Sequence, residues 1–518
     1  MNTITSHPRW DSASADELRD WQLARLRRYL REVVVPFCPH YRDLATDHGL
    51  HPDLIAGPED LEQIPFTRKR DLTADAEAPR KFVIQPDPAA LKRRPSTVLT
   101  ALLRGRRHAA DRLAHEFRPV MMTSTTGRSS DPVPFLYTKH DLDLLTLAGR
   151  RVMQLGRSKP EYRHFNAFPY APHLAFWQAH YASIGFTTFC LSSGGGKVMG
   201  TEGNLRLINK VQPEVIIGMP TFLYHMMREA IDQGLQLPRL KMLVLGGEKA
   251  PQGLRRKLRE LAAGLGAERV FVLSTYGFTE AKMAWLECRP PEPGSPSSGY
   301  HLSPDLGIVE VIDPETGRLV DEHQPGEIVY TQLDARGSTV LRYRTGDLIE
   351  GGLTWQPCPW CGRTGPRLLG RISRVSDIHR LQLDKVKGTL VDLNQLEHVL
   401  DEVPGLAAWQ LELRKVDDDP MERDQIIIHA CGEAGNGGDH LRDVINSRMR
   451  QATELSANGI AFHTLEEMRD RLGVGRLLKE EKIVDHRPGH GPGLPDQTAD
   501  KTADGRTTPQ PETLGMSS

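Results

Sequence analysis

The sequence has little of three things: long apolar runs, cysteine and net charge. No stretch approaches the roughly 18 consecutive apolar residues that a membrane-spanning helix needs, and the opening MNTITSHPRW lacks the basic and apolar regions of a secretion signal. Lys and Arg number 66 against 67 Asp and Glu, so the formal charge of -1 provides no general attraction for nucleic acid or an anionic membrane. We therefore expect a cytoplasmic protein that has neither nucleic acid nor a membrane as a partner. Any anion must be bound at a local site.

Six cysteines in 518 residues are too few and too unevenly spaced for a disulfide framework, and only Cys358 and Cys361 form a close pair. Hydrophobic residues make up 39% of the chain and charged residues 26%. This mixture is typical of a soluble globular protein and excludes a fibre, a repeat array or a wholly disordered chain. The length allows more than one domain.

The arrangement of apolar residues divides the chain into three parts. From about 120 to 350, β-type runs such as VIIGM, KMLVLGG and RVFVLSTYG alternate with helical stretches, which predicts an α/β sheet covered by helices. We expect a large domain over residues 1–370, with a helical segment at 15–80, and a small α+β domain over 371–487. Residues 488–518 hold almost nothing apolar and are predicted to be a disordered tail.

Residues 85–118 form a basic segment. Its cations include Lys92, Arg93, Arg94, Arg104, Arg106, Arg107 and Arg112. Such a segment is either a binding face or a solvated helix and loop. The second interpretation is favoured because no aromatic side chains interleave with the charges, as a nucleic-acid stacking platform requires.

Four short motifs carry residues suited to binding a nucleotide. MMTSTTGRSSDPV, at 121–133, is rich in hydroxyls around a glycine, and such a loop can turn its amides and side chains onto phosphate oxygens. In LVLGGEKA at 243–250, STYGFTEAK at 274–282 and LRYRTGDL at 341–348, a β-type run reaches a glycine and then a carboxylate. These acids are expected at strand ends, where open α/β sheets bind their ligands. Each motif alone is also compatible with an ordinary turn or surface carboxylate.

The order of these motifs, followed by Gly370-Arg371 and a small C-terminal domain with Lys479, resembles the adenylate-forming superfamily of acyl-CoA synthetases, peptide-synthetase adenylation domains and luciferases. Within it the chain is most similar to the phenylacetate-CoA ligase group. The segments that carry this likeness are FCPHYRDLATDHGLHPDLIAGPEDLEQIPFTRKRDL, SSGGG, IIGMPTFL and LKEEKIVDHR. The resemblance extends from about residue 15 to 487 and implies a large AMP-binding domain of layered sheets and helices with a small mobile α+β lid.

Transferred position by position, the resemblance implies a nucleotide site. The β and γ phosphates of ATP would be held by Thr123, Ser124, Thr125, Thr126 and Gly127. The adenine and the acyl pocket would be flanked by Gly246, Gly247, Glu248, Tyr276 and Gly277.

The resemblance also implies the groups that act on the reacting phosphate. Thr279 would touch the α-phosphate, and Glu280 would bind magnesium. Asp347 would accept the ribose hydroxyls, while Arg371, at the domain junction, would contact ribose or phosphate. Lys479 would bridge the substrate carboxylate and the α-phosphate.

The lysine assignment has an alternative, because LLKEEKIV contains both Lys479 and Lys482 and such a charged stretch is usually just a solvated face. Counting back from VDHR by the family pattern favours Lys479. A mobile ammonium group suits the chemistry, since joining a carboxylate to a triphosphate requires that the repulsion between two anions be cancelled, which Mg²⁺ and one lysine can do.

A second constellation consists of Cys288, His301, Cys358 and Cys361. The knuckle CPWCGR directs two sulfurs at one point, and Cys288 with His301 can complete a tetrahedral Cys₃His site. Some phenylacetate-CoA ligase relatives are built with structural zinc there, so we expect a zinc knuckle over 288–361. The alternatives are a redox pair or unliganded thiols. A redox CxxC should open a helix, whereas CPWCGRTGP is rich in helix breakers, which favours zinc.

The sequence departs from the family pattern at several positions. Ser124 stands where the family usually keeps glycine, which leaves slower or altered nucleotide handling open. The stretch after Arg371 is longer than usual, so the hinge is either Ser373 or Asp384. Tyr170 and His173, in FPYAPHLAFW, either line the acyl pocket or belong to a packed aromatic helix start.

We expect an enzyme that uses ATP and Mg²⁺ to activate a small, aromatic or related carboxylic acid as acyl-AMP and passes it to coenzyme A. Two alternatives remain: transfer of the acyl group to an amine or a carrier-protein thiol, and a catalytically inactive nucleotide-binding homologue. The sequence leaves the identity of the acid open. It also leaves open the oligomeric state, a homodimer included.

Overall fold

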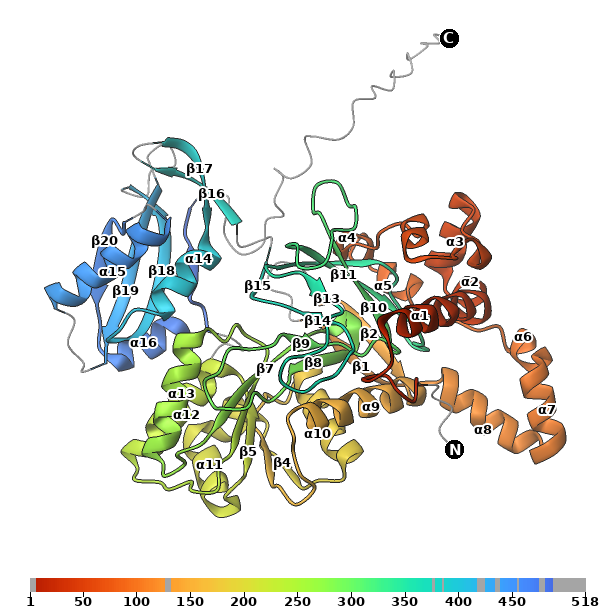
Figure 1. The fold of residues 1–518 in the computed structure, drawn as a ribbon, viewed down its shortest axis with the longest axis horizontal. Coiled ribbons are helices and arrows are strands. Elements are labelled where there is room, and N and C mark those ends of the chain that lie inside the picture. Colours follow the sequence, from red (N-terminus) through yellow and green to blue (C-terminus); the bar gives the residue numbers. More distant parts are fainter. Residues whose placement is uncertain are drawn as a thin grey trace, which may run out of the picture.

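The structure, a computed structural model, consists of a large body and a smaller C-terminal body (Figure 1). The residues it describes are 6–125, 132–374, 378–383, 386–416, 424–433, 438–453, 456–474 and 480–487. Within these ranges, no helix has both the length and the apolar character needed to cross a membrane. The mixed α/β architecture expected from the sequence is confirmed.

The centre of the large body is a sheet buried on both faces. Its strands, in spatial order, are β13 (Leu353–Thr354), β14 (Arg367–Leu368), β9 (Tyr300–His301), β8 (Met283–Glu287), β7 (Phe271–Phe278), β6 (Met242–Leu245), β5 (Val215–Gly218), β3 (His164–Asn166) and β4 (Cys190–Ser192). Neighbours from β7 to β4 pair in parallel, whereas β7 and β8 are antiparallel. The carboxyl ends of the parallel strands therefore meet at one edge.

Alternate residues of the parallel strands pack against helices on opposite faces. Ile216 and Leu243 share a core with the first set of helices: α11 (Gly195–Val211), α12 (Pro220–Asp232) and α13 (Gln252–Gly264). Val215 and Met242 face the second set: α9 (Lys139–Leu155) and α10 (Leu174–Phe186). This two-sided burial explains why these strands read as continuous apolar runs in the sequence.

A second, antiparallel sheet packs against the N-terminal helices. Its strands are β10 (Gly307–Ile312), β11 (Gly326–Gln332), β12 (Tyr343–Ile349) and β15 (Ile372–Arg374). The helical segment expected at 15–80 begins with α1 (Ala15–Tyr29), followed by a π-helical turn, η1 (Leu30–Val34). Leu26 and Leu30 share one core with Ile328 of β11. Strand β15, which the sequence placed in the small domain, pairs with β12 of the large body.

The remaining N-terminal elements are short. They are α2 (Val35–Phe37), α3 (Pro39–His48), the 3₁₀ turns η2 (Pro52–Leu54) and η3 (Pro58–Gln63), α4 (Lys69–Leu72), α5 (Ala78–Lys81), α6 (Pro88–Arg93), α7 (Pro95–Arg104) and α8 (Arg106–Phe117). The antiparallel hairpin β1 (Pro119–Ser124) and β2 (Pro134–Thr138) then leads into α9.

The small body has its own core. It contains the hairpin β16 (Ile378–Leu383) and β17 (Val386–Asp392), a sheet ordered β20 (Gly459–Phe462), β19 (Asp424–Gly432), β18 (Leu406–Lys415) and β21 (Ile483–Asp485), and the helices α14 (Leu393–Asp401), α15 (Asp439–Thr453) and α16 (Leu465–Leu472). Leu396, Leu411 and Ile445 bury its centre. Strands β18 and β19 pair in antiparallel fashion at the middle of this sheet.

Candidate active site

The hydroxyl-rich loop joins β1 and β2, and its two ends are bonded to each other. Thr125 N–H donates to Val133 O at 3.1 Å, and Val133 N–H donates to Thr125 Oγ1 at 3.0 Å. Thr126 and Gly127 lie outside the described residues. Thr123, expected to contact phosphate, has no exposed surface, and its hydroxyl donates to Tyr137 Oη at 3.3 Å. Its side chain therefore belongs to the core, since successive side chains of a strand point to opposite faces.

The aromatic stretch before α10 supports this loop. Ser124 N–H donates to Pro172 O at 2.6 Å, and His173 Nδ1 donates to Ser124 O at 3.1 Å. Tyr170 is 64% exposed and packs edge-on against Phe176, with ring centroids 5.2 Å apart. Of the two interpretations left open by the sequence, this geometry fits the packed helix start.

The GGE motif follows β6 at the edge of the sheet, where the parallel strands end. A Cβ at Gly246 would collide with Thr275 Oγ1 of β7, so only glycine fits there. Gly247 has φ +81°, a left-handed conformation that glycine adopts without strain. Glu248 Oε2 accepts a hydrogen bond from Thr221 Oγ1 at 2.6 Å, which ties this loop to the start of α12.

Tyr276, on β7, and Asp347, on β12, meet across the two sheets. Tyr276 Oη donates to Asp347 Oδ2 at 3.0 Å, and Arg374 Nε lies 3.0 Å from Asp347 Oδ1. Burial, reinforced by the Asp347 carboxylate, raises the pKa of Tyr276 well above its ordinary value. A Cβ at Gly277 would stand 2.7 Å from Ala284 Cβ on β8, so this exposed position also requires glycine.

Glu280 lies in the 3₁₀ turn η4 (Thr279–Ala281), directly after β7, and is only 7% exposed. Tyr343 Oη donates to its Oε1 at 2.8 Å. Burial raises the pKa of Glu280, and the nearby Asp347 adds to the increase. Glu280 and Asp347, the carboxylate pair, are thus brought close enough to repel each other, while the adjoining Thr279 and Tyr276 are only half-buried.

Two site residues, Tyr343 and Arg374, escaped the sequence reasoning. Tyr343 and Asp347 are four residues apart on β12, and the even spacing places them on one face of the strand, where each meets a residue of the YGFTE motif. The four-residue spacing between Tyr343 and Asp347 can be read directly in the sequence LRYRTGDL. Arg374 gives no comparable signal, because its partner is set by the pairing of β15 with β12.

Arg371 does not lie beside the carboxylate pair. Its guanidinium forms two 2.9 Å hydrogen bonds with the Glu350 carboxylate, and both side chains are 57% exposed. In this arrangement Arg371 is held at the surface by Glu350, and its expected contact with ribose or phosphate stays a prediction. Ser373 pairs with Leu348 inside the sheet, a poor position for a hinge, and Asp384 lies outside the described residues.

Lys479 also lies outside the described residues, but its neighbours meet the large body and the small body's core. Glu480 Oε1 lies 3.1 Å from His225 Nε2 of α12. Lys482, the alternative lysine, is buried with its Nζ 2.8 Å from Asp401 Oδ1, as expected of a structural ion pair inside the small body. Lys482 is thus already paired within the small body, and the assignment of the catalytic lysine to Lys479 stays a prediction.

The two bodies touch along α13 and the loop before it. Lys249 Nζ lies 2.6 Å from Glu397 Oε2 of α14. Gly253 N–H donates to the Glu402 carboxylate, and a Cβ at Gly253 would collide with the carbonyl oxygen of Asp401. The small body therefore rests on the first turn of α13 without room for a side chain between them.

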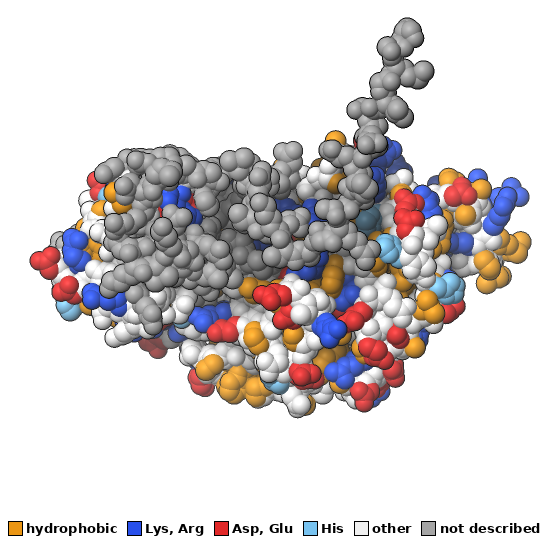
Figure 2. Space-filling view, turned by 90° about the horizontal axis from the view of Figure 1, so that it is seen from above, with side chains coloured by type: hydrophobic (Ala, Val, Ile, Leu, Met, Phe, Trp, Pro, Cys, Tyr) orange, Lys and Arg blue, Asp and Glu red, His pale blue; other side chains and the backbone are white. Residues whose placement is uncertain are grey.

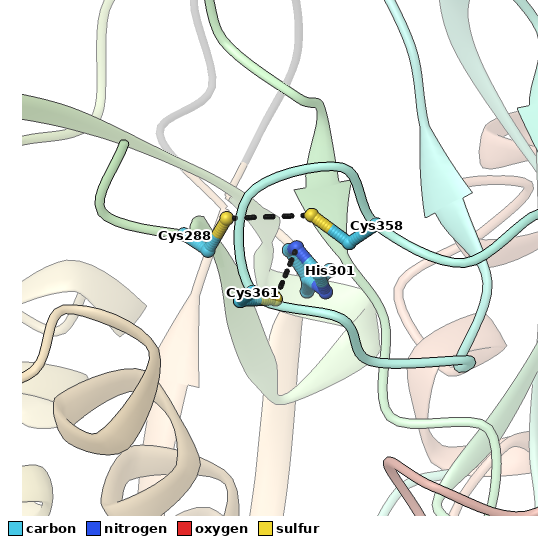
Figure 3. Close-up of side chains that lie close together, drawn as sticks. All are labelled: Cys288, His301, Cys358 and Cys361. Atoms are coloured by element: carbon cyan, nitrogen blue, oxygen red, sulfur yellow. Dashed lines mark hydrogen bonds between the residues drawn. The ribbon is translucent and has the colours of Figure 1, made fainter. Parts of the chain in front are cut away.

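The predicted metal ligands come together from three segments (Figure 3). Cys288 follows β8, His301 is in β9, and Cys358 and Cys361 lie between β13 and β14. Their ligand atoms all lie within 4.8 Å of one another. The Cys288 and Cys358 sulfurs are 3.6 Å apart, and Cys361 Sγ is 3.7 Å from His301 Nε2.

These separations match the edge of a zinc-centred tetrahedron, which is about 3.7 Å for Zn–S bonds of about 2.3 Å. Ser298 Oγ lies 3.2 Å from Cys288 Sγ and 3.3 Å from Cys358 Sγ, so it supplies a hydrogen-bonding neighbour to the sulfurs. Gly362 adopts φ +74° and donates its N–H to Cys358 O at 2.9 Å, which closes the knuckle. The donor set therefore fits a closed zinc site.

Comparison with known proteins agrees with this architecture. A sequence profile described as AMP-binding enzyme matches residues 173–335. The chain is 29% identical over 489 residues to the phenylacetate-coenzyme A ligase of Aromatoleum evansii, covering 92% of this chain and 96% of the relative. It is 28% identical over 415 residues to the enzyme of that name from Thermus thermophilus, covering 79% and 81%.

Solved structures of 2-hydroxyisobutyryl-CoA ligase share the fold. The complex with R3-HIB-AMP in the postadenylation state has a TM-score of 0.72 at 19% identity, covering 93% of this chain and 92% of that chain. The complex with 2-HIB-AMP and CoA in the thioesterification state has a TM-score of 0.60 at 18% identity, covering 94% and 95%. These structures share the fold of this chain, and over most of its length the sequence is similar to enzymes named phenylacetate-coenzyme A ligase.

Proposed function

We propose that the protein is an ATP-dependent acid–coenzyme A ligase, which activates a small carboxylic acid as acyl-AMP and transfers the acyl group to coenzyme A. The observation that carries this proposal is the convergence of Tyr276, Glu280 and Asp347 beside the glycines that end β6. Relatives named phenylacetate-coenzyme A ligase, aligned over most of the chain, support the carboxylic acid and the thiol acceptor.

In this proposal each side chain of the site has one task. Asp347, fixed by Tyr276 and Arg374, would accept the ribose hydroxyls, because a held carboxylate makes strong hydrogen bonds without reorganising. Gly246 and Gly277 let Thr275 and Ala284 pack directly against the backbone, which brings the neighbouring strands close together beside the proposed nucleotide site. Lys479 would bring an ammonium group to the α-phosphate and neutralise the charge that develops there.

Glu280 fits a magnesium ligand. Its carboxylate is buried and held by a neutral donor, Tyr343, so a divalent cation would relieve the unfavourable charge that raises its pKa. When bound, Mg²⁺ would neutralise the triphosphate and orient it. Thr279, in the same turn, would place its hydroxyl beside the α-phosphate.

Three finer assignments belong to the proposal. We assign an aromatic acid as substrate, supported by the names of the relatives and by Phe168, whose ring would stand 3.2 Å from a Cβ at Gly246. We assign structural zinc to the cluster of Cys288, His301, Cys358 and Cys361. We place the boundary between the large domain and the lid after Arg374, because β15 completes the sheet of the large body.

The test is pyrophosphate release from ATP and Mg²⁺ with a panel of aryl acids, followed by mass identification of the product formed with coenzyme A. We expect a thioester from wild type and at least a hundred-fold loss of pyrophosphate release in Lys479→Ala. Lys501→Ala, the same substitution in the C-terminal tail, is the matched control and should react normally. Pyrophosphate release that is unchanged in Lys479→Ala, or absent with every acid and without ATP binding, would overturn the proposal.

A further inference from the structure

The helices α6 to α8 form an arm at one end of the large body (Figure 1). No residue of α7 is buried. Its apolar side chains are instead turned outward, with exposed fractions of 44% for Val98, 57% for Leu99, 79% for Leu102 and 74% for Leu103. These positions follow the spacing i, i+1, i+4, i+5, so they form one stripe along the helix.

Helix α7 is oriented the opposite way to an ordinary surface helix, which buries its apolar stripe. It packs on α8 through its polar side, where Arg112 Nη1 donates to Thr100 Oγ1 at 3.1 Å. Gly105, with φ +89°, makes the sharp turn between the two helices. The leucines at the tip are therefore presented by a short, supported hairpin.

The arm is also strongly basic, although the chain as a whole has a formal charge of -1. Residues 88–118 contain eight Lys and Arg against two carboxylates, Asp111 and Glu116. Arg106 and Arg107 are exposed and follow Leu102 and Leu103 across the turn. In Figure 2, the arm end of the molecule shows basic and hydrophobic side chains next to one another.

We propose that this arm docks the protein on an anionic lipid bilayer, lying in the plane of the interface. Leu102 and Leu103 would enter the boundary between headgroups and acyl chains, while Arg106 and Arg107 would contact the lipid phosphates. The arm is convex and carries leucines beside arginines, a combination that matches a surface both negative and apolar. The proposal is independent of the reaction and replaces the expectation, drawn from net charge alone, that the protein has no membrane partner.

The same features disfavour other occupants. A two-fold symmetric contact between two copies would bring two strongly basic arms together, and like charges repel. A nucleic acid would use the arginines but leave the leucine stripe exposed to water, and the arm lacks an aromatic stacking platform. Only a partner with both negative charge and an apolar layer uses both halves of the arm.

Vesicle co-sedimentation of the full chain tests the proposal. Wild type should sediment with vesicles of phosphatidylcholine and phosphatidylglycerol, should not sediment with phosphatidylcholine alone, and should be released by high salt. The double variant Leu102→Glu, Leu103→Glu should bind anionic vesicles roughly ten-fold or more weakly, since both side chains are largely exposed and the fold does not depend on them.

The matched control is Ile184→Glu with Phe189→Glu, which makes the same charge change at apolar side chains that are 55% and 53% exposed elsewhere. It should bind vesicles like wild type. Sedimentation velocity without lipid provides the second measurement. Absence of vesicle binding, equal loss in the control variant, or a wild-type dimer that Leu102→Glu, Leu103→Glu converts to monomer without vesicle binding would each overturn the proposal.

Discussion

The carboxylate pair and the cysteine cluster lie at opposite ends of β8 and are built differently. Glu280 precedes the strand and Cys288 follows it. The cluster is closed, because four donors face one point within 4.8 Å of one another. The carboxylate pair keeps two like charges together, with a tyrosine donor on each carboxylate and one cation, Arg374, beside Asp347. The comparison suggests that the closed group stabilises the fold, whereas the open group keeps an unfavourable charge that a ligand can relieve.

The largest expected effect is that of Glu280→Gln. Removing the metal-binding charge should lower Mg²⁺-dependent adenylation about a thousand-fold. Because the pKa of Glu280 is raised in the folded state, that state binds the proton more tightly than the unfolded chain. The ionised form therefore destabilises the fold increasingly as pH rises from the unfolded pKa through the folded one. Glu280→Gln should raise Tm at pH 8 by roughly 2 °C and leave it unchanged near pH 4.

Glu350→Gln is the matched control for this change. Its hydrogen bonds with Arg371 lower the pKa of Glu350, so the stabilisation is present above the unfolded pKa and is lost as pH falls through the folded pKa. Thermal unfolding at pH 8 should show a small decrease or no change in Tm, with normal adenylation. A rise in Tm in both variants would show that loss of a carboxylate, and not burial of Glu280, is responsible.

Substitutions in the cysteine cluster should change metal affinity and thermal stability and leave catalysis unaffected. Cys361→Ser should weaken zinc binding on the order of a hundred-fold and lower Tm. The KM for ATP should stay unchanged, because the cluster lies at the other end of β8 from the proposed nucleotide site. Metal analysis of the purified protein and thermal unfolding measure this. Cys190→Ser, on β4 away from the cluster, should retain zinc. Thiols of wild type that react as fast before as after chelation would contradict a zinc site.

Asp347→Asn keeps the shape of the second carboxylate and removes its charge. We expect the KM for ATP to rise about thirty-fold, the effect of losing a charge-assisted hydrogen bond of about 2 kcal/mol. Binding of ATP measured by calorimetry should show the same loss. An unchanged ATP affinity would mean that the ribose lies elsewhere, and that the bond from Tyr276 to Asp347 only joins the two sheets.

Tyr343→Phe should have the smallest effect. The hydroxyl of Tyr343 lowers the pKa of Glu280, so its removal should raise that pKa further. If Glu280 must be ionised to bind Mg²⁺, the acidic limb of the rate profile should move to higher pH. Activity should fall about three-fold at the low end of the profile and recover above it or with added Mg²⁺. A uniform loss at every pH would indicate a structural role instead.

Much of this molecule follows from its sequence because local patterns and tertiary contacts agree. The buried parallel strands at 215–218 and 242–245 are continuous apolar runs, and the four cluster ligands were found from residue type and spacing together with the family resemblance. What the sequence could not give are contacts between segments far apart in the chain. The partners of Arg371 and Arg374 depend on the register of β15, and the burial of Thr123 depends on which face of β1 meets Tyr137.

Gly253 gives the experimenter a way to control the arrangement of the two bodies. Even a methyl group at this position would collide with the Asp401 carbonyl oxygen. Gly253→Ala should therefore push the small body away from the first turn of α13. The substitution of a single glycine thus becomes a tool for loosening the contact between the two bodies.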